Sequence, residues 1–167
     1  MKKLITVACA LAMAACAFAV EAPVLKGLWS AGPIAASYDA DGDKLGVEKN
    51  IGGITGGKNI KVVNKGGPKP GIGNTTTGYV QVSNGAAGSL TFTAPAGTSK
   101  ITICAKAVSG KAFIVKAGKD TLLRANGCCK SDDYEDHVIE HKFAEDTVIT
   151  ISGFGGANCN LKAILVE

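Results

Sequence analysis

The feature that most constrains the fold is a series of short β-branched segments separated by turn residues. Nine segments of four to seven residues are rich in Val, Ile and Thr and are bounded by Gly, Asn or Pro. Such spacing is typical of a β-sandwich or barrel. No window keeps a helical period over three turns, so we expect at most single-turn helices beyond the first twenty residues. The predicted strands are residues 60–64, 79–83, 90–94, 101–105, 113–116, 121–124, 137–143, 147–151 and 161–166.

The N-terminus has the pattern of a bacterial secretory signal peptide. Lys2 and Lys3 precede an apolar run over residues 4–18, and Ala17-Phe18-Ala19 offers the small residues that signal peptidase needs. The run is shorter than the roughly 20 residues of a membrane span. We therefore expect residues 1–19 to be removed, residues 20–167 to form one domain, and the protein to be secreted, periplasmic or on the cell surface. Lipid attachment at Cys16 is the alternative processing route.

Four cysteines follow the signal peptide: Cys104, Cys128, Cys129 and Cys159. An even number in an exported protein indicates two disulfides. A bond between the adjacent Cys128 and Cys129 would strain the peptide between them. We therefore predict that Cys104 and Cys159 pair with these two, in an order that stays open. A four-cysteine zinc site usually has two C-x₂₋₄-C pairs, which this sequence lacks.

Composition and motifs exclude several functions. The net charge is only +4, aromatic residues make up 5% of the chain, and no run of Lys or Arg is present, so we expect no nucleic-acid partner. No G-x-S-x-G motif occurs, and Ser109-Gly110 and Ser152-Gly153 are interpreted as turns. The sequence therefore predicts a protein that is not an enzyme.

Alternating carboxylates at Asp39, Asp41 and Asp43 surround Gly42. Asp41-Gly42 is a strong hairpin signal, which predicts a turn flanked by strands at 35–38 and 45–47. The alternative is a structural calcium loop, because Ca²⁺ prefers several oxygen ligands from a tightly curved segment. No other cofactor is expected.

A second polar cluster contains His137 and His141 after an acidic run. The spacing would place both imidazoles on one face of a helix, as in zinc enzymes, but Val138 stands where the HExxH motif needs Glu. On a strand, His137 and His141 share a face with Ile139. We interpret this segment as a strand of an exposed outer sheet.

The last 90 residues or so resemble a known class of module. The segments Gly78-Tyr79-Val80-Gln81-Val82, 88–95, 100–106, 148–153 and 160–166 carry the resemblance. Together they are similar to the jelly-roll accessory modules, of carbohydrate-binding type, found in bacterial secreted polysaccharide lyases and glycoside hydrolases. The resemblance covers residues 77–167. It implies an antiparallel β-sandwich of jelly-roll type and a carbohydrate partner.

Aromatic side chains that could stack on a sugar are few. Trp29 and Tyr134 are the rings expected to be exposed, and hydrogen-bonding partners stand near Tyr134 at Asn126, Asp132 and Asp133. We therefore predict a non-catalytic protein that binds carbohydrate or another cell-surface glycan through these residues. The alternative is a structural or adhesive envelope protein without a sugar site.

Overall fold

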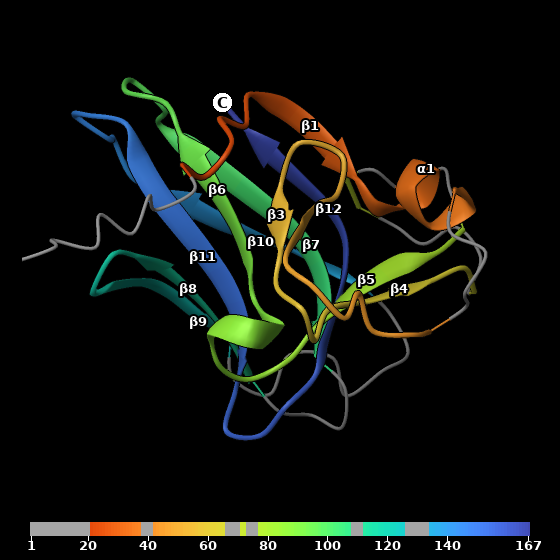
Figure 1. The fold of residues 1–167 in the computed structure, drawn as a ribbon. Helices are drawn as coiled ribbons and strands as arrows, with labels where there is room; N and C mark the ends of the chain where they lie inside the picture. The colour runs from red at the N-terminus through yellow and green to blue at the C-terminus, as the bar shows by residue number, and fades with distance from the viewer. Residues whose placement is uncertain (1–20, 38–41, 66–70, 73–76, 108–111, 126–133) are drawn as a thin grey trace, which may run out of the picture.

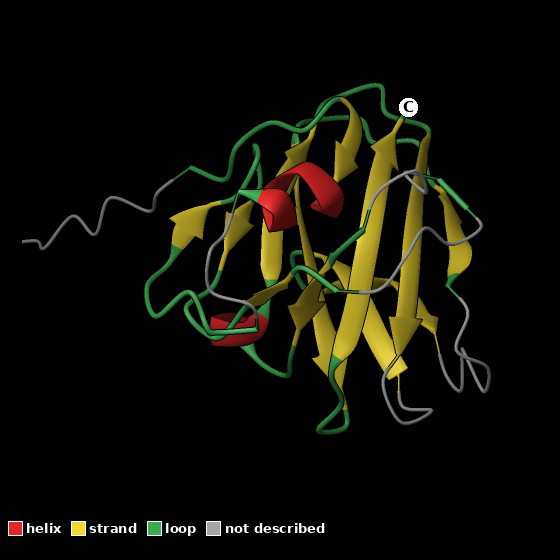
Figure 2. Cartoon of the chain, turned by 90° about the vertical axis from the view of Figure 1, so that its right-hand side faces the viewer, coloured by secondary structure: helices red, strands yellow, loops and turns green. Residues whose placement is uncertain are grey.

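Two six-stranded antiparallel sheets pack face to face and form a β-sandwich (Figure 1). The computed structural model describes residues 21–37, 42–65, 71–72, 77–107, 112–125 and 134–167. Figure 2 shows the two layers after a quarter turn of the molecule. The predicted all-β, antiparallel sandwich is therefore confirmed.

Each sheet mixes strands from distant parts of the chain. The first sheet has the order β10 (Glu135–Glu140), β7 (Lys100–Ala107), β12 (Cys159–Val166), β5 (Tyr79–Val82) and β4 (Lys61–Val63), with β1 (Gly27–Ser30) also paired to β12. The second sheet has the order β2 (Lys49–Asn50), β3 (Thr55–Gly56), β6 (Leu90–Ala94), β11 (Thr147–Phe154), β8 (Ala112–Ala117) and β9 (Asp120–Ala125). The helical elements are α1 (Ala31–Ala36) and the 3₁₀ turn η1 (Ala86–Gly88).

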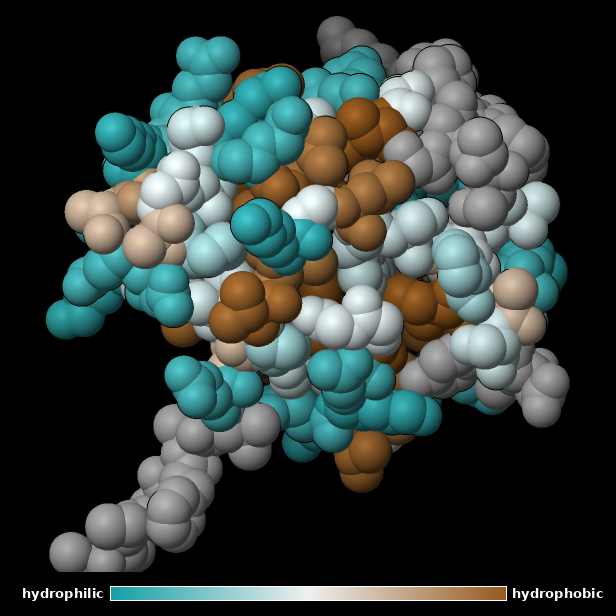
Figure 3. Space-filling view, turned by 90° about the horizontal axis from the view of Figure 1, so that it is seen from above, coloured by the Kyte–Doolittle hydropathy of each residue, from teal (hydrophilic) through white to brown (hydrophobic). Residues whose placement is uncertain are grey.

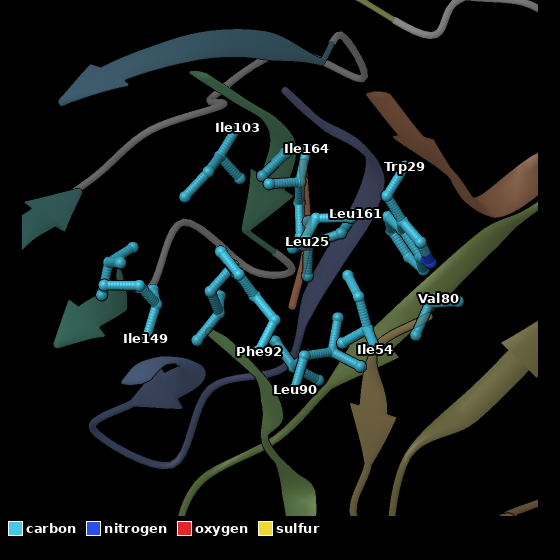
Figure 4. Close-up of a cluster of buried hydrophobic side chains, with 14 of the residues drawn as sticks. Leu25, Trp29, Ile54, Val80, Leu90, Phe92, Ile103, Ile149, Leu161 and Ile164 are labelled. Atoms are coloured by element: carbon cyan, nitrogen blue, oxygen red, sulfur yellow. The ribbon is translucent and has the colours of Figure 1, made fainter. Parts of the chain in front are cut away.

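Alternation along the strands builds the core between the sheets. On β11, Ile149 and Ile151 are fully buried while the intervening Thr150 is partly exposed. Successive side chains point to opposite faces of a sheet, so the apolar set faces inward. Phe92 from the second sheet and Leu161 from the first meet in this core (Figure 4).

The N-terminal segment connects the two sheets. The Thr93 hydroxyl on β6 donates to the carbonyl of Ala22 at 2.7 Å, and the amide of Leu25 donates to the carbonyl of Thr93 at 2.9 Å. A few residues later, β1 pairs with β12 in the other sheet. Residues 22–30 therefore close one end of the sandwich.

The nine predicted strands are all present, and all except β6 differ from the prediction at one or both ends. The largest difference is at β10, predicted at 137–143 and found at Glu135–Glu140. Three strands were not predicted: β1, β2 and β3, the last two being only two residues long. Helix α1, with six residues, is slightly longer than the single turn expected.

The hairpin predicted around Gly42 is wrong. Ala35 belongs to α1, and the segment after Gly42 pairs with β4 instead. The Gly42 amide donates to the Val62 carbonyl at 3.0 Å, and the Leu45 amide donates to the Ile60 carbonyl at 2.9 Å. Because residues 42–45 satisfy their backbone groups at the edge of the first sheet, tertiary pairing overrides the local turn preference.

Candidate binding site

Trp29 is buried and not available to a ligand. Its side chain is 3% exposed in the main core, and its Nε1 donates to the carbonyl of Ile51 at 2.9 Å. The prediction of an exposed ring at this position is therefore wrong. A lone Trp is more stably placed where its large apolar surface is buried and its N–H has an acceptor.

Tyr134 is also buried, at 8% exposure, immediately before β10. The Lys162 ammonium lies 5.5 Å from the centre of its ring, and Asn160 forms a hydrogen bond with its hydroxyl. Burial, followed by the neighbouring Tyr79, raises the pKa of Tyr134 well above its usual value. The ring is thus a neutral packing element, which corrects the prediction that it is exposed. Its predicted partners Asn126, Asp132 and Asp133 lie outside the described residues.

The predicted disulfide cysteines are only partly within the described residues. Cys104 on β7 and Cys159 on β12 are buried, and Cys128 and Cys129 lie outside the described ranges. In the β7–β12 ladder, Cys104 is opposite Ala163 whereas Cys159 is opposite Ala107. The two cysteines are therefore several residues out of register with each other. The predicted bonds from each of them to Cys128 and Cys129 remain a prediction.

The calcium hypothesis also remains a prediction. Asp39 and Asp41 lie outside the described residues, and Asp43 is exposed. Within the described ranges, no three His, Cys, Asp or Glu side chains are close enough to hold a metal ion. None of the helices in those ranges is long and apolar enough to cross a membrane.

His137 faces the core and not an exposed outer surface, which corrects that interpretation. Its ring meets the edge of Phe113 from the opposite sheet, with centroids 4.9 Å apart at 82°. The buried Nε2 has no hydrogen-bond partner among the described residues. His141 lies beyond the end of β10 and packs on Phe143, with centroids 4.6 Å apart. His137 and His141 therefore pack on different aromatic rings.

Stability should fall on acidification because of His137. Burial lowers its pKa below the usual histidine value, against the opposing effects of Glu135, a hydrogen bond to the Ala105 backbone, and Asp136. The unfolded chain therefore takes up a proton at higher pH than the folded protein, so stability declines as the pH falls below about 6.5. Urea unfolding of the wild type and His137→Gln between pH 7.5 and 5 measures this slope. We expect the free energy of unfolding of His137→Gln to depend less on pH than that of the wild type. The control His141→Gln, at an exposed position, should show the same pH dependence as the wild type.

A polar row crosses the outer face of the second sheet. One residue from each strand stands in register with the next: Asn50, Thr55, Thr91, Thr150, Lys116 and Thr121. All six are at least partly exposed. At the usual spacing between strands, the row is about 24 Å long. The second sheet thus presents hydroxyl, amide and ammonium groups to solvent along a line perpendicular to its strands.

A groove of about 340 Å³ lies beside this row. Polar groups of Asn84, Ser89, Lys116, Thr150 and Ser152 line it, together with the apolar side chains of Ile114 and Phe154. The walls come from β8, β11 and the turn that leads into η1. Lys116 and Thr150 belong to both the row and the groove, so the two features form one candidate site.

Phe154 is the partly exposed aromatic ring of this groove. The guanidinium carbon of Arg124, on β9, lies 4.0 Å from its ring centre. A cation over the face of an aromatic ring is attracted by the ring quadrupole, which holds both groups in place. The ring and the guanidinium therefore form a stacked pair at one end of the site.

Phe154 was not among the predicted site residues, because the predicted strand ended at Ile151. Ser152-Gly153 was interpreted as a turn, but both residues lie within β11, which extends to Phe154. The alternation of Val148, Thr150 and Ser152 on the outer face was the available signal. Continuing it by one step would have placed Phe154 on that face.

The comparisons with known proteins concern the fold. No family model matches the chain, and no curated protein matches it in sequence. Among solved structures, CsCBM6-3 from Clostridium stercorarium, in complex with cellobiose, is 14% identical with a TM-score of 0.48, over 89% of this chain and 98% of that chain. The CBM22-1 xylan-binding domain of Paenibacillus barcinonensis Xyn10C is 14% identical with a TM-score of 0.41, over 77% of this chain and 97% of that chain.

An adhesin domain and parts of enzymes also match. The K1 cleaved adhesin domain of Lys-gingipain from Porphyromonas gingivalis W83 is 14% identical with a TM-score of 0.43, over 65% of this chain and 82% of that chain. A carbohydrate esterase from Cellvibrio japonicus matches over 30% of its own length. The strand pairing of the chain shows the β-sandwich, and the structures named here are what it is similar to, at TM-scores of 0.41 to 0.48 for the binding modules and the adhesin domain.

Proposed function

We propose that the protein binds carbohydrate in the groove on the outer face of the second sheet. The observation that carries the proposal is the combination of hydroxyl groups, an amide and one aromatic ring along a single groove. Ser, Thr and Asn side chains both donate and accept hydrogen bonds, as sugar hydroxyls do. The partly exposed ring of Phe154 supplies apolar surface for the C–H groups of a pyranose.

Binding fits the groove better than catalysis does. Hydrolysis of a glycosidic bond ordinarily requires two carboxyl groups on either side of that bond. Among the described residues that line the groove, none is acidic and none is histidine. The groove therefore has groups that hold a sugar and lacks, in its described part, those that would cleave it.

The edges of the sheets weigh against the alternative of a self-assembling structural protein. Assembly through sheet edges favours long, flat, apolar edge strands. The edge strands β2 and β4 have two and three residues, and β10 exposes Glu135, Asp136 and Glu140. The remaining edge strand, β9, has six residues and exposes Asp120, Thr121 and Arg124. Viewed from above, apolar surface areas are separated by hydrophilic and neutral residues (Figure 3). These edges favour a protein that stays separate and uses a face for binding.

Phe154→Ala should weaken glycan binding at least about tenfold, because the ring supplies the main apolar contact of the groove. Titration calorimetry of the protein with xylan, pectic and peptidoglycan fragments measures the effect, with dissociation constants of roughly 10⁻³ to 10⁻⁵ M expected for the wild type.

Val148→Ala is the matched control, because Val148 lies on the same outer face of β11 but outside the groove and is 46% exposed. This variant should bind like the wild type. If Phe154→Ala bound the fragments as tightly as the wild type does, the groove would not be the binding site. If no fragment gave a heat of binding with the wild type, the proposal of carbohydrate binding would be wrong.

A further inference from the structure

The polar row extends well beyond the groove. Its six residues stand one to a strand, so the row crosses every strand of the second sheet, from the edge strand β2 to the edge strand β9. We infer that the site holds the interior of a long, linear polysaccharide that lies across the strands along this row. This inference rests on the proposed function and names the class of glycan.

A second hollow, of about 200 Å³, lies at the other end of the row. It is lined by Glu21, Pro23, Glu48, Lys49, Asn50 and Thr55. Asn50 on β2 and Thr55 on β3 are members of the row. The groove beside Phe154 contains two other members, Lys116 and Thr150. The row therefore connects two hollows, each of which shares two residues with it.

Thr91 on β6 lies between the two hollows. It is opposite Thr55 in one ladder and opposite Thr150 in the other. Neighbouring strands are about 4.8 Å apart, so Thr55 and Thr150 are about 10 Å apart across the sheet. A single sugar ring is too short to contact both. Successive units of an extended chain advance by roughly one strand spacing, so such a chain can offer about one sugar to each strand that it crosses.

The second hollow has the groups that bind sugar hydroxyls. The Thr55 hydroxyl can both donate and accept a hydrogen bond. The Asn50 Oδ1 accepts from the amide of Gly53 at 2.9 Å, which holds this side chain in place and leaves its NH₂ group as a donor. Glu21 and Glu48 are exposed and add carboxylate acceptors. None of the described lining residues is aromatic, so this hollow would add hydrogen bonds and the groove would add the stacking contact.

The two ends of the row are at open edges of the sheet. Among the described strands, β2 pairs only with β3, and β9 pairs only with β8. The terminal members of the row, Asn50 and Thr121, are both exposed. A polysaccharide aligned with the row can therefore continue past both edges. A site that recognised the end of a chain would need a wall there instead.

A series of ligand lengths tests this inference. Titration calorimetry uses linear fragments of xylan, of homogalacturonan and of peptidoglycan glycan strands, each separated by size from disaccharide to octasaccharide. A trisaccharide can fill the groove alone, whereas a hexasaccharide can reach both hollows. We expect the dissociation constant to fall about tenfold between these two lengths, because the second set of contacts forms within the same complex. Longer fragments should bind with little further gain.

Variants at the two ends of the row locate the contacts. Thr55→Val removes one hydroxyl from the second hollow, so it should weaken hexasaccharide binding about fivefold and trisaccharide binding less than about twofold. Thr55→Ser keeps the hydroxyl and should bind like the wild type. Thr150→Val, in the groove, should weaken the binding of both lengths.

Thr147→Val is the matched control on β11. Thr147 lies on the opposite face of the strand from Thr150, and its hydroxyl donates to the Glu145 carbonyl at 2.8 Å. This variant loses the same hydroxyl group outside the row and should leave the affinities for both lengths unchanged.

The outcomes separate this inference from the proposed function. If the trisaccharide bound as tightly as the hexasaccharide, the extended site would be wrong and carbohydrate binding in the groove would stand. If longer fragments bound more tightly but Thr55→Val did not change their affinity, the chain would leave the groove in another direction, and the inference would again be wrong. If no fragment of any length bound, both the inference and the proposed function would be wrong.

Discussion

Trp29→Ala should lower the free energy of unfolding by about 3–5 kcal/mol, the cost of removing a large aromatic side chain from a packed core. The indole is 3% exposed, and it also donates a hydrogen bond to the carbonyl of Ile51. The substitution therefore both opens a cavity and leaves a buried acceptor without its donor. Chemical denaturation should show a lower midpoint with an unchanged slope.

A second variant separates the loss of the hydrogen bond from the loss of packing, and a third serves as an exposed control. Trp29→Phe keeps an aromatic ring and removes the N–H, so it should cost about 1–3 kcal/mol for the unsatisfied carbonyl. Leu28→Ala changes the neighbouring residue of β1, which is 56% exposed, and should alter stability by less than about 0.5 kcal/mol. If Trp29→Ala were as stable as Leu28→Ala, the indole would not be a core residue and its role as a ligand-binding ring would return.

Gly153→Ala should destabilise the fold by about 1–3 kcal/mol, because the backbone approaches this position too closely for a side chain. A Cβ atom here would overlap the carbonyl oxygen of Ala157 and would lie 3.2 Å from the carbonyl carbon of Ser83. The Gly153 amide also donates to the Ser83 carbonyl at 3.0 Å. These neighbours are backbone atoms, which cannot rotate away as a flexible side chain can.

Thermal unfolding of Gly153→Ala, with Ser152→Ala as its control on the same strand, measures this effect. Ser152 is partly exposed on the outer face, so its loss should change the melting temperature little. A Gly153→Ala variant as stable as Ser152→Ala would mean that both the Ala157 carbonyl and the chain at Ser83 move away from β11 easily. The groove would then have a movable wall, since Asn84 and Gly153 both line it.

Local patterns in the sequence were enough to predict most of the strands, but not their order in the sheets. Leu90–Ala94 was predicted with its observed ends because its alternation is regular and Pro95 stops it. The two-residue strands β2 and β3 carry too few side chains for a period to be recognised. They exist because Thr55 finds a partner on β6, which is information from distant parts of the chain.

The candidate site could not be found from aromatic residues taken one at a time. Tyr134 was selected because it stands in an acidic run, and Trp29 because it lies near the expected mature N-terminus between Gly27 and Gly32. Burial, however, depends on what the other sheet and the neighbouring strands supply. The site that the structure presents is a row across strands, with Thr55, Thr91 and Thr150 as its middle members. Residues that are far apart in sequence meet there only once the register of the sheet is known.

The position of β12 has a consequence for how the chain can fold while it is being made. This strand follows every other strand in sequence, yet it lies inside the first sheet and pairs with β7, β5 and β1. A chain synthesised from its N-terminus therefore contains these three strands before their shared partner exists. Such long-range pairing makes folding slow. During that interval the apolar segments of β5 and β7 lack their partner strand, which is when aggregation or capture by a chaperone would compete with folding.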